Sequence, residues 1–143
     1  EEYAVMLGED EVIVSAEIKR MEQEKIICSY RALIDWDKVE DDWIEALVEV
    51  QTIPKGEEGY REIAERVRKF PEVKSFFFVS GGFDFILLLQ GRNIKEISKF
   101  ISTNLASIPD VSGTQTHFLL DKYKEWGVDM YQDDSDPRIQ VSP

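Results

Sequence analysis

The fold of this 143-residue chain is decided by residues 73–90, which read VKSFFFVSGGFDFILLLQ. Both ends of this stretch are apolar and rich in residues that favour β-strands. Its centre, residues 80–84, contains two consecutive glycines, and glycine adopts the backbone conformations that tight turns require. The stretch therefore predicts a β-hairpin.

A predicted amphipathic helix lies on each side of the hairpin. Apolar residues at helical spacing mark the first helix before Pro71, namely Tyr60, Ile63, Ala64, Val67 and Phe70. The second helix follows Gly91 and ends before Pro109, with its apolar face formed by Ile94, Ile97, Ile101, Leu105 and Ile108. Both helices are expected to cover one face of a sheet.

One strand before the first helix and one strand after the second helix complete the pattern. Between residues 43 and 52, Ile44, Ala46, Val48 and Val50 alternate with Glu45 and Glu49, as in a strand with one buried face. Residues 114–120 are the last predicted strand. The order βαββαβ predicts an α+β protein with a ferredoxin-like sandwich, in which an antiparallel sheet carries two helices on one face.

The predicted strands carry more apolar surface than two helices can cover. The residues that indicate this surplus are Ile44, Ala46, Val48, Val50, Phe76, Phe78, Ile86 and Leu88. An uncovered apolar sheet face is typically buried by a symmetric partner. We therefore expect the domain to associate with copies of itself.

Residues 1–25 predict two short helices joined at Gly8. Asp10 is a suitable N-cap for the second helix, which is expected to end near Lys25. One apolar face is expected from Val14, Ile18, Met21 and Ile26. The pair is interpreted as a partial helix-turn-helix whose first helix is missing, and residues 26–36 are predicted to form a connecting strand.

Composition excludes several classes of protein. The chain is 43% hydrophobic and 32% charged, which is typical of globular proteins, and no apolar run reaches the roughly 18 residues of a membrane span. One cysteine and one histidine, Cys28 and His117, are too few for an intramolecular disulfide or a common zinc site. We expect a cytoplasmic protein with no cofactor, metal or membrane partner.

The residues give no sign of an enzyme. They contain no evident nucleophile and base pair, phosphate-binding loop or metal cluster. Scattered carboxylates such as Asp41, Asp42 and Glu45 are typical of a solvated surface.

Several short motifs recur in a characteristic order along the chain. They are residues 16–22 before Ile26 and Ile27, then residues 71–73, 80–84, 108–111 and 114–116. Each motif alone is common, but their order within one βαββαβ string resembles the Lrp/AsnC family of amino-acid-responsive transcription regulators. The resemblance covers nearly the whole chain.

This resemblance implies four parts. They are a partial helix-turn-helix at 1–25, a connecting strand and linker at 26–42, a ferredoxin-like effector-binding and oligomerisation domain at 43–122, and an acidic C-terminal tail at 123–143. It also implies a homodimer that assembles further into a tetramer or octamer, with effectors bound between dimers.

The implied effector site combines the glycine turn with the last strand. Its candidate residues are Ser80, Gly81, Gly82, Phe83, Asp84, Thr114, Gln115, Thr116 and His117. Backbone N–H groups would bind a carboxylate and Asp84 an ammonium group, so the effector is expected to be an amino acid. Structural alternatives stay open, because the glycines also suit a plain hairpin turn, Asp84 a turn cap and His117 ordinary packing.

DNA binding is the second implied activity. The polar candidates on the second N-terminal helix are Ser15, Lys19, Arg20 and Gln23. However, this chain has Ile13, Ala16 and Glu17 where family members often carry Thr and Arg. Residues 1–25 hold eight acidic and three basic side chains, and the whole chain has a net charge of −12, which opposes contact with phosphates.

Two functions therefore remain. The favoured one is a transcriptional regulator that binds DNA through its helix-turn-helix and senses an amino acid at an intersubunit site. The alternative is an oligomeric effector-binding module that has lost DNA binding and regulates a metabolic partner by protein contact.

Overall fold

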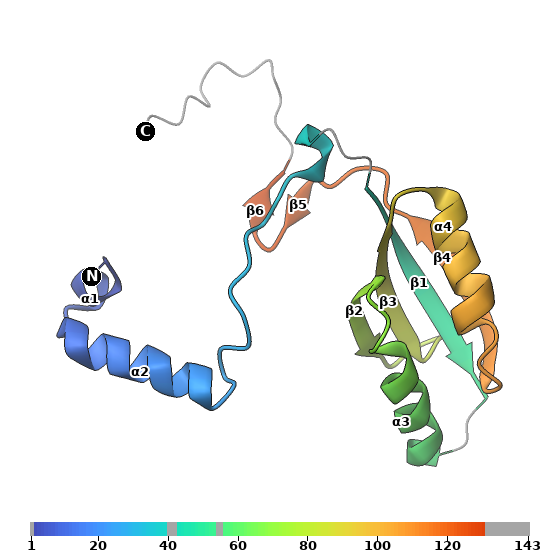
Figure 1. The fold of residues 1–143 in the computed structure, drawn as a ribbon, viewed down its shortest axis with the longest axis horizontal. Helices are drawn as coiled ribbons and strands as arrows, with labels where there is room; N and C mark the ends of the chain where they lie inside the picture. The colour runs from blue at the N-terminus through green and yellow to red at the C-terminus, as the bar shows by residue number, and fades with distance from the viewer. Residues whose placement is uncertain (1, 40–42, 54–55, 131–143) are drawn as a thin grey trace. The chain divides into compact units, whose positions relative to one another are not determined.

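The chain divides into two compact units, Glu1–Ile34 and Asp35–Pro143. A computed structural model describes residues 2–39, 43–53 and 56–130 (Figure 1). In this described part of the chain, no helix is long and apolar enough to cross a membrane.

Two helices form the first unit, as predicted. Helix α1 spans Glu2–Leu7 and helix α2 spans Glu11–Gln23. Gly8 follows α1 with a φ of +67°, a conformation that glycine adopts without strain. Asp10 caps α2, because its side chain accepts a hydrogen bond from the N–H of Val12 at 2.8 Å.

The apolar face of α2 differs from the prediction at one position. Val14, Ile18 and Met21 are half-buried, but Ile26 is 60% exposed and Ile27 is half-buried in its place. The N–H groups of both residues donate to the carbonyl of Met21, at 2.9 and 3.1 Å. The chain therefore turns back tightly after α2, which puts Ile27 rather than Ile26 beside the helix.

The predicted connecting strand is wrong. Residues 26–34 form no strand, and the short 3₁₀ helix η1 follows at Trp36–Lys38. The β-rich composition of this segment suits a strand, but a strand also needs a neighbouring backbone to bond with. Among the described residues of this single chain, none pairs with it.

The second unit has the predicted βαββαβ order. Strands β1 (Ile44–Thr52), β2 (Val73–Phe78), β3 (Phe85–Gly91) and β4 (Val111–Phe118) form an antiparallel sheet in the order β2-β3-β1-β4 (Figure 1). Helix α3 spans Gly56–Val67, and α4 spans Ile94–Phe100 and continues as the π-helical turn η2 at Ile101–Leu105. The ferredoxin-like prediction is confirmed.

One face of the sheet carries the core. Ala46, Val48 and Val50 of β1 are buried and lie opposite Leu89, Leu87 and Phe85 of β3. Side chains of both helical segments pack on these six residues, namely Ile63, Val67, Ile97, Phe100, Ile101, Leu105 and Ile108. Gly91 allows this close packing, because a Cβ there would lie 2.9 Å from Cγ1 of Ile97.

The opposite sheet face is called the open face here. Strand register places Leu47, Ile86 and Leu88 on it, all half-buried, together with Phe77, which is 57% exposed. Phe76 and Phe78 were predicted to contribute to the apolar surplus, but their rings pack with Phe85 on the helix-covered face. Phe77 is therefore the exposed aromatic residue of β2 on the open face.

The predicted C-terminal tail begins with ordered structure. Strands β5 (Lys124–Glu125) and β6 (Val128–Asp129) pair as a hairpin around Gly127, whose φ is +82°. The rest of the predicted tail, residues 131–143, lies outside the described residues, as do Asp41 and Asp42 of the predicted linker.

Lys122 connects this hairpin to the main sheet. Its ammonium group contacts the carboxylates of Glu45 on β1 and Glu125 on β5. Burial lowers the pKa of Lys122, but the hydrogen bonds to the two carboxylates and their negative charges together raise it by more, so its net shift is upward. The charged form of Lys122 is therefore favoured by the fold.

We predict that Leu87→Ala destabilises the second unit strongly. Leu87 is 1% exposed at the centre of the core, and truncating such a leucine costs about 2–5 kcal/mol of unfolding free energy. Leu120→Ala is the matched control, because Leu120 is 88% exposed. Urea unfolding followed by circular dichroism measures both variants, and equal midpoints would contradict the assigned core.

Candidate functional site

Asp84 holds the hairpin turn to its neighbours. Its Oδ2 atom accepts hydrogen bonds from the N–H and the hydroxyl of Thr52, both at 2.8 Å. The hydroxyl of Tyr60 on α3 donates to Oδ1 at 3.4 Å. The Asp84 carboxylate therefore ties the turn to the end of β1 and to α3.

Gly81 gives the turn its shape. Its φ of +151° lies where residues with a side chain are strained, so the turn requires glycine at this position. This observation favours the alternative in which Gly81 serves the hairpin turn rather than the effector. Gly82 has no such backbone requirement.

A polar cavity of about 320 Å³ lies beside this turn on the second unit. It is lined by Glu49, Gln51, Gly82, Phe83, Gly113, Thr114 and Gln115. The structure thus brings together four of the predicted effector residues, which are Gly82, Phe83, Thr114 and Gln115.

Gln51 joins the two sides of this cavity. Its side-chain amide donates to the carbonyl of Gly82 at 2.9 Å. On the other side it approaches Gly113, where a Cβ would lie 3.6 Å from its Oε1 atom. Gln51 therefore spans the space between the hairpin turn and β4.

The other predicted effector residues lie elsewhere. Ser80 and Gly81 are exposed in the turn and do not line the cavity, and neither does Asp84. Thr116 pairs with the buried Val48, so it belongs to the helix-covered side. The Nε2 atom of His117 lies 3.2 Å from Oε1 of Glu49, which places His117 next to a cavity residue.

Sequence reasoning missed Glu49, Gln51 and Gly113 as cavity residues. The alternation of residues 43–52 does put Glu49 and Gln51 on the face opposite the core. The pattern does not predict the pairing of β1 with β4, which places Glu49 opposite Gln115 and Gln51 opposite Gly113. That register is a long-range property.

The predicted DNA-binding residues lie on α2 and are all exposed. Ser15, Lys19 and Gln23 are spaced by four residues, so they share one helix face. Arg20 lies off this face. Its guanidinium donates hydrogen bonds to Glu17 at 2.6 Å and to Glu24.

In these bonds the positive charge of Arg20 is paired with carboxylates of neighbouring residues. Hydrogen bonds to Glu17 and Glu24 raise the pKa of Arg20, and the bond with Arg20 lowers the pKa of Glu17. Contact with a DNA phosphate would have to compete with two carboxylates. Lys19 is therefore the predicted DNA-binding cation that forms no ion pair among the described residues.

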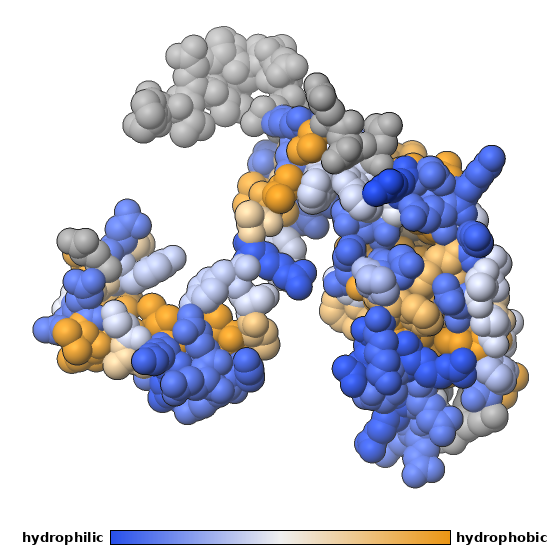
Figure 2. Space-filling view, viewed as in Figure 1, coloured by the Kyte–Doolittle hydropathy of each residue, from blue (hydrophilic) through white to orange (hydrophobic). Residues whose placement is uncertain are grey.

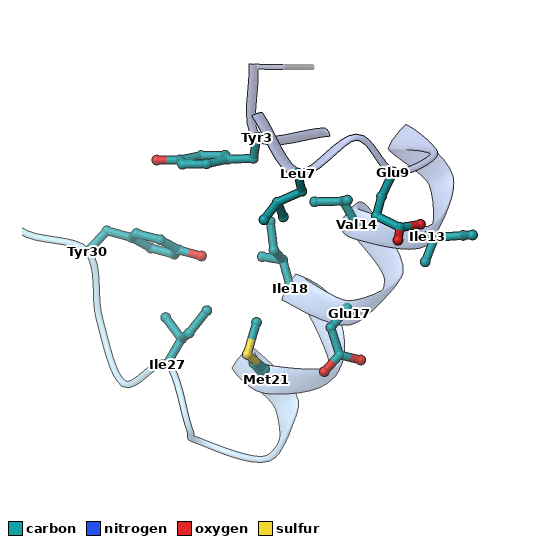
Figure 3. A pocket seen from close by; sticks show the side chains of 10 residues that line it. All are labelled: Tyr3, Leu7, Glu9, Ile13, Val14, Glu17, Ile18, Met21, Ile27 and Tyr30. Carbon is teal, nitrogen blue, oxygen red and sulfur yellow. The ribbon is translucent and has the colours of Figure 1, made fainter. Parts of the chain in front are cut away.

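An apolar groove of about 450 Å³ lies on the other side of α2 (Figure 3). Its wall combines Leu7 of α1 with Val14, Ile18 and Met21 of α2 and with Ile27 beyond the helix. Figure 2 shows hydrophobic side chains gathered along this side of the two N-terminal helices. None of Ser15, Lys19, Arg20 and Gln23 lines the groove.

We predict that Asp84→Ala lowers the free energy of unfolding. The substitution leaves two donors of Thr52 without their acceptor, and Thr52 is only 8% exposed, so the expected loss is about 1–3 kcal/mol. Asp121→Ala is the control, because Asp121 is exposed. Chemical unfolding measures both, and an unchanged midpoint for Asp84→Ala would show that these bonds do not stabilise the turn.

Comparisons with known proteins agree with this architecture. A model of the Lrp/AsnC ligand binding domain matches residues 45–128. The HTH-type transcriptional regulator YugG of Bacillus subtilis is 39% identical over 127 residues, which cover 88% of this chain and 76% of that protein. A proline dehydrogenase transcriptional activator of Rhizobium radiobacter is 30% identical, covering 78% of this chain and 70% of the relative.

A solved structure has a similar fold. The crystal structure of a transcriptional regulator from Neisseria meningitidis in complex with L-methionine has a TM-score of 0.69 and 25% identity. The match covers 85% of this chain and 78% of that one. These relatives are named as transcriptional regulators, and their family is not enzymatic. Since the family model matches more than half of its residues, the chain belongs to the Lrp/AsnC family of transcriptional regulators.

Proposed function

We propose that this regulator senses an amino acid in the cavity between the hairpin turn and β4. The observation that carries the proposal is the convergence of Gly82 and Phe83 from the turn with Thr114 and Gln115 from β4. These segments are distant in sequence and were assigned to one effector site from the family resemblance. The methionine complex of the Neisseria relative supports an amino acid as the effector class.

The chemistry of the cavity fits a zwitterion. Glu49 offers a carboxylate to an ammonium group, and the carboxamide of Gln115 offers hydrogen-bond donors to a carboxylate. Within the described residues, the N–H groups of Gly82 and Phe83 donate to no acceptor. They are additional donors for an anionic group.

We also propose that copies of the chain assemble through the open face. Leu47, Phe77, Ile86 and Leu88 form an apolar strip on it, and covering such a strip removes apolar surface from water. A homodimer formed in this way, assembling further to a tetramer or octamer, would place effector cavities near subunit boundaries. Ligand binding would then favour one assembly over another.

DNA binding by the first unit belongs to the same proposal. It is supported by two short helices joined by a glycine turn and by the exposed face of Ser15, Lys19 and Gln23. The ion pairs of Arg20 with Glu17 and Glu24 favour the second candidate, an effector-binding module that regulates a metabolic partner without DNA. The two functions differ in one measurable property, which is affinity for duplex DNA.

The sensing role predicts a specific thermal shift. At least one L-amino acid should raise the melting temperature of the protein by several degrees, because a ligand at 100 times its Kd stabilises the folded state by about 2.7 kcal/mol. A fluorescence screen of the twenty amino acids measures this effect. D-enantiomers are the matched controls, and equal or absent shifts across the set would contradict amino acid sensing.

The DNA-binding role predicts a defined effect of Lys19→Ala. The wild-type chain should retard duplexes selected from a random library, and the substitution should weaken binding and reduce the salt dependence by about one phosphate contact. Lys69→Ala, in the second unit, is the control with the same loss of charge. Lack of any retardation by the wild type would favour the alternative function.

A further inference from the structure

The cavity beside the turn has a simple charge pattern. Among its lining residues, Glu49 is the one with a formal charge, and the others contribute carboxamides, an aromatic ring and backbone groups. No cationic side chain lines it in the described part of the chain. A ligand with a carboxylate but no amine would bring a negative charge towards Glu49 without compensation.

Asp84 was the residue expected to bind an ammonium group, but its oxygens already have partners. Thr52 donates twice to Oδ2, and Tyr60 approaches Oδ1. Asp84 is also absent from the cavity wall. To bind a ligand cation it would have to leave the bonds that hold the turn to β1 and α3.

Glu49, by contrast, lines the cavity and has an oxygen atom available to a ligand. It lies in the middle of β1 on the open face, directly opposite Gln115 of β4, and its side chain is 25% exposed. His117 contacts its Oε1 atom at 3.2 Å, and its Oε2 atom accepts no hydrogen bond from the described residues. The carboxylate is thus held in place on one side and has a free oxygen on the other.

We propose that Glu49, rather than Asp84, binds the ammonium group of the effector. This inference rests on the proposed function, since it assumes that an amino acid enters this cavity. It makes Glu49 a specificity-determining residue that selects α-amino acids over α-hydroxy acids and other carboxylates of the same shape. Charge-assisted bonds of this kind are stronger than neutral ones, especially when the carboxylate is partly shielded from water.

The test uses the full chain and isothermal titration calorimetry. The probes are L-methionine, as bound by the Neisseria relative, or the amino acid with the largest thermal shift if methionine gives none, and the α-hydroxy acid with the same side chain. The wild type should prefer the amino acid. Glu49→Gln keeps the shape of the side chain and should weaken amino acid binding by at least about tenfold. The same substitution removes the repulsion between two carboxylates, so it should leave hydroxy acid binding unchanged or make it tighter.

Two further variants complete the experiment. Glu49→Asp keeps the charge and should keep the preference for the amine at lower affinity, so it also serves if Glu49→Gln folds poorly. Asp84→Asn removes the charge of the rival residue and should retain the preference. Unfolding midpoints of all variants show whether each one is folded under the titration conditions.

The outcomes separate this inference from the proposed function. If the wild type binds no amino acid, the sensing proposal itself fails and Glu49 loses its assigned role with it. If the wild type binds an amino acid but Glu49→Gln discriminates against the hydroxy acid as before, only the role of Glu49 is refuted. Loss of discrimination in Asp84→Asn, with Glu49→Gln unaffected, would assign the ammonium group to Asp84.

Discussion

Strand β1 lies between β3 and β4, and the second unit is organised around the alternation of its side chains. Ala46, Val48 and Val50 point to the helices and are at most 2% exposed. Their burial against both helices supplies the apolar contact that stabilises the fold. The same alternation places the residues between them on the opposite face. Strand β1 therefore contributes side chains to both the core and the cavity.

Local patterns made much of this architecture predictable. The glycine turn, the two helical stripes and the alternation in β1 each arise from neighbours in sequence, and the structure contains all of them where they were expected. The segment 26–36 had a comparable β-rich pattern but forms no strand, since the bonding partner that a strand needs is not encoded in its own residues. The β5–β6 hairpin was missed because its strands have two residues each.

Some residues that line the cavity could be predicted from the sequence, and others could not. Gly82, Phe83, Thr114 and Gln115 followed from family motifs and do line one cavity. Glu49 did not follow, because its place beside Gln115 depends on how β1 and β4 align. Asp84 illustrates the converse, since a carboxylate beside a glycine turn is equally suited to bond with its own chain, and here it does so with Thr52.

Gln51 and Thr52 are consecutive residues that hold the same hairpin turn from opposite faces of the sheet. Gln51 bonds to Gly82 on the cavity side, and Thr52 bonds to Asp84 on the side of α3. Movement of the turn in either direction would stretch one of these attachments. Both attachments restrain the wall of the cavity, so a ligand bound there as proposed would lose little free energy to ordering the protein, which would leave more of the contact energy for affinity and for discrimination between similar molecules.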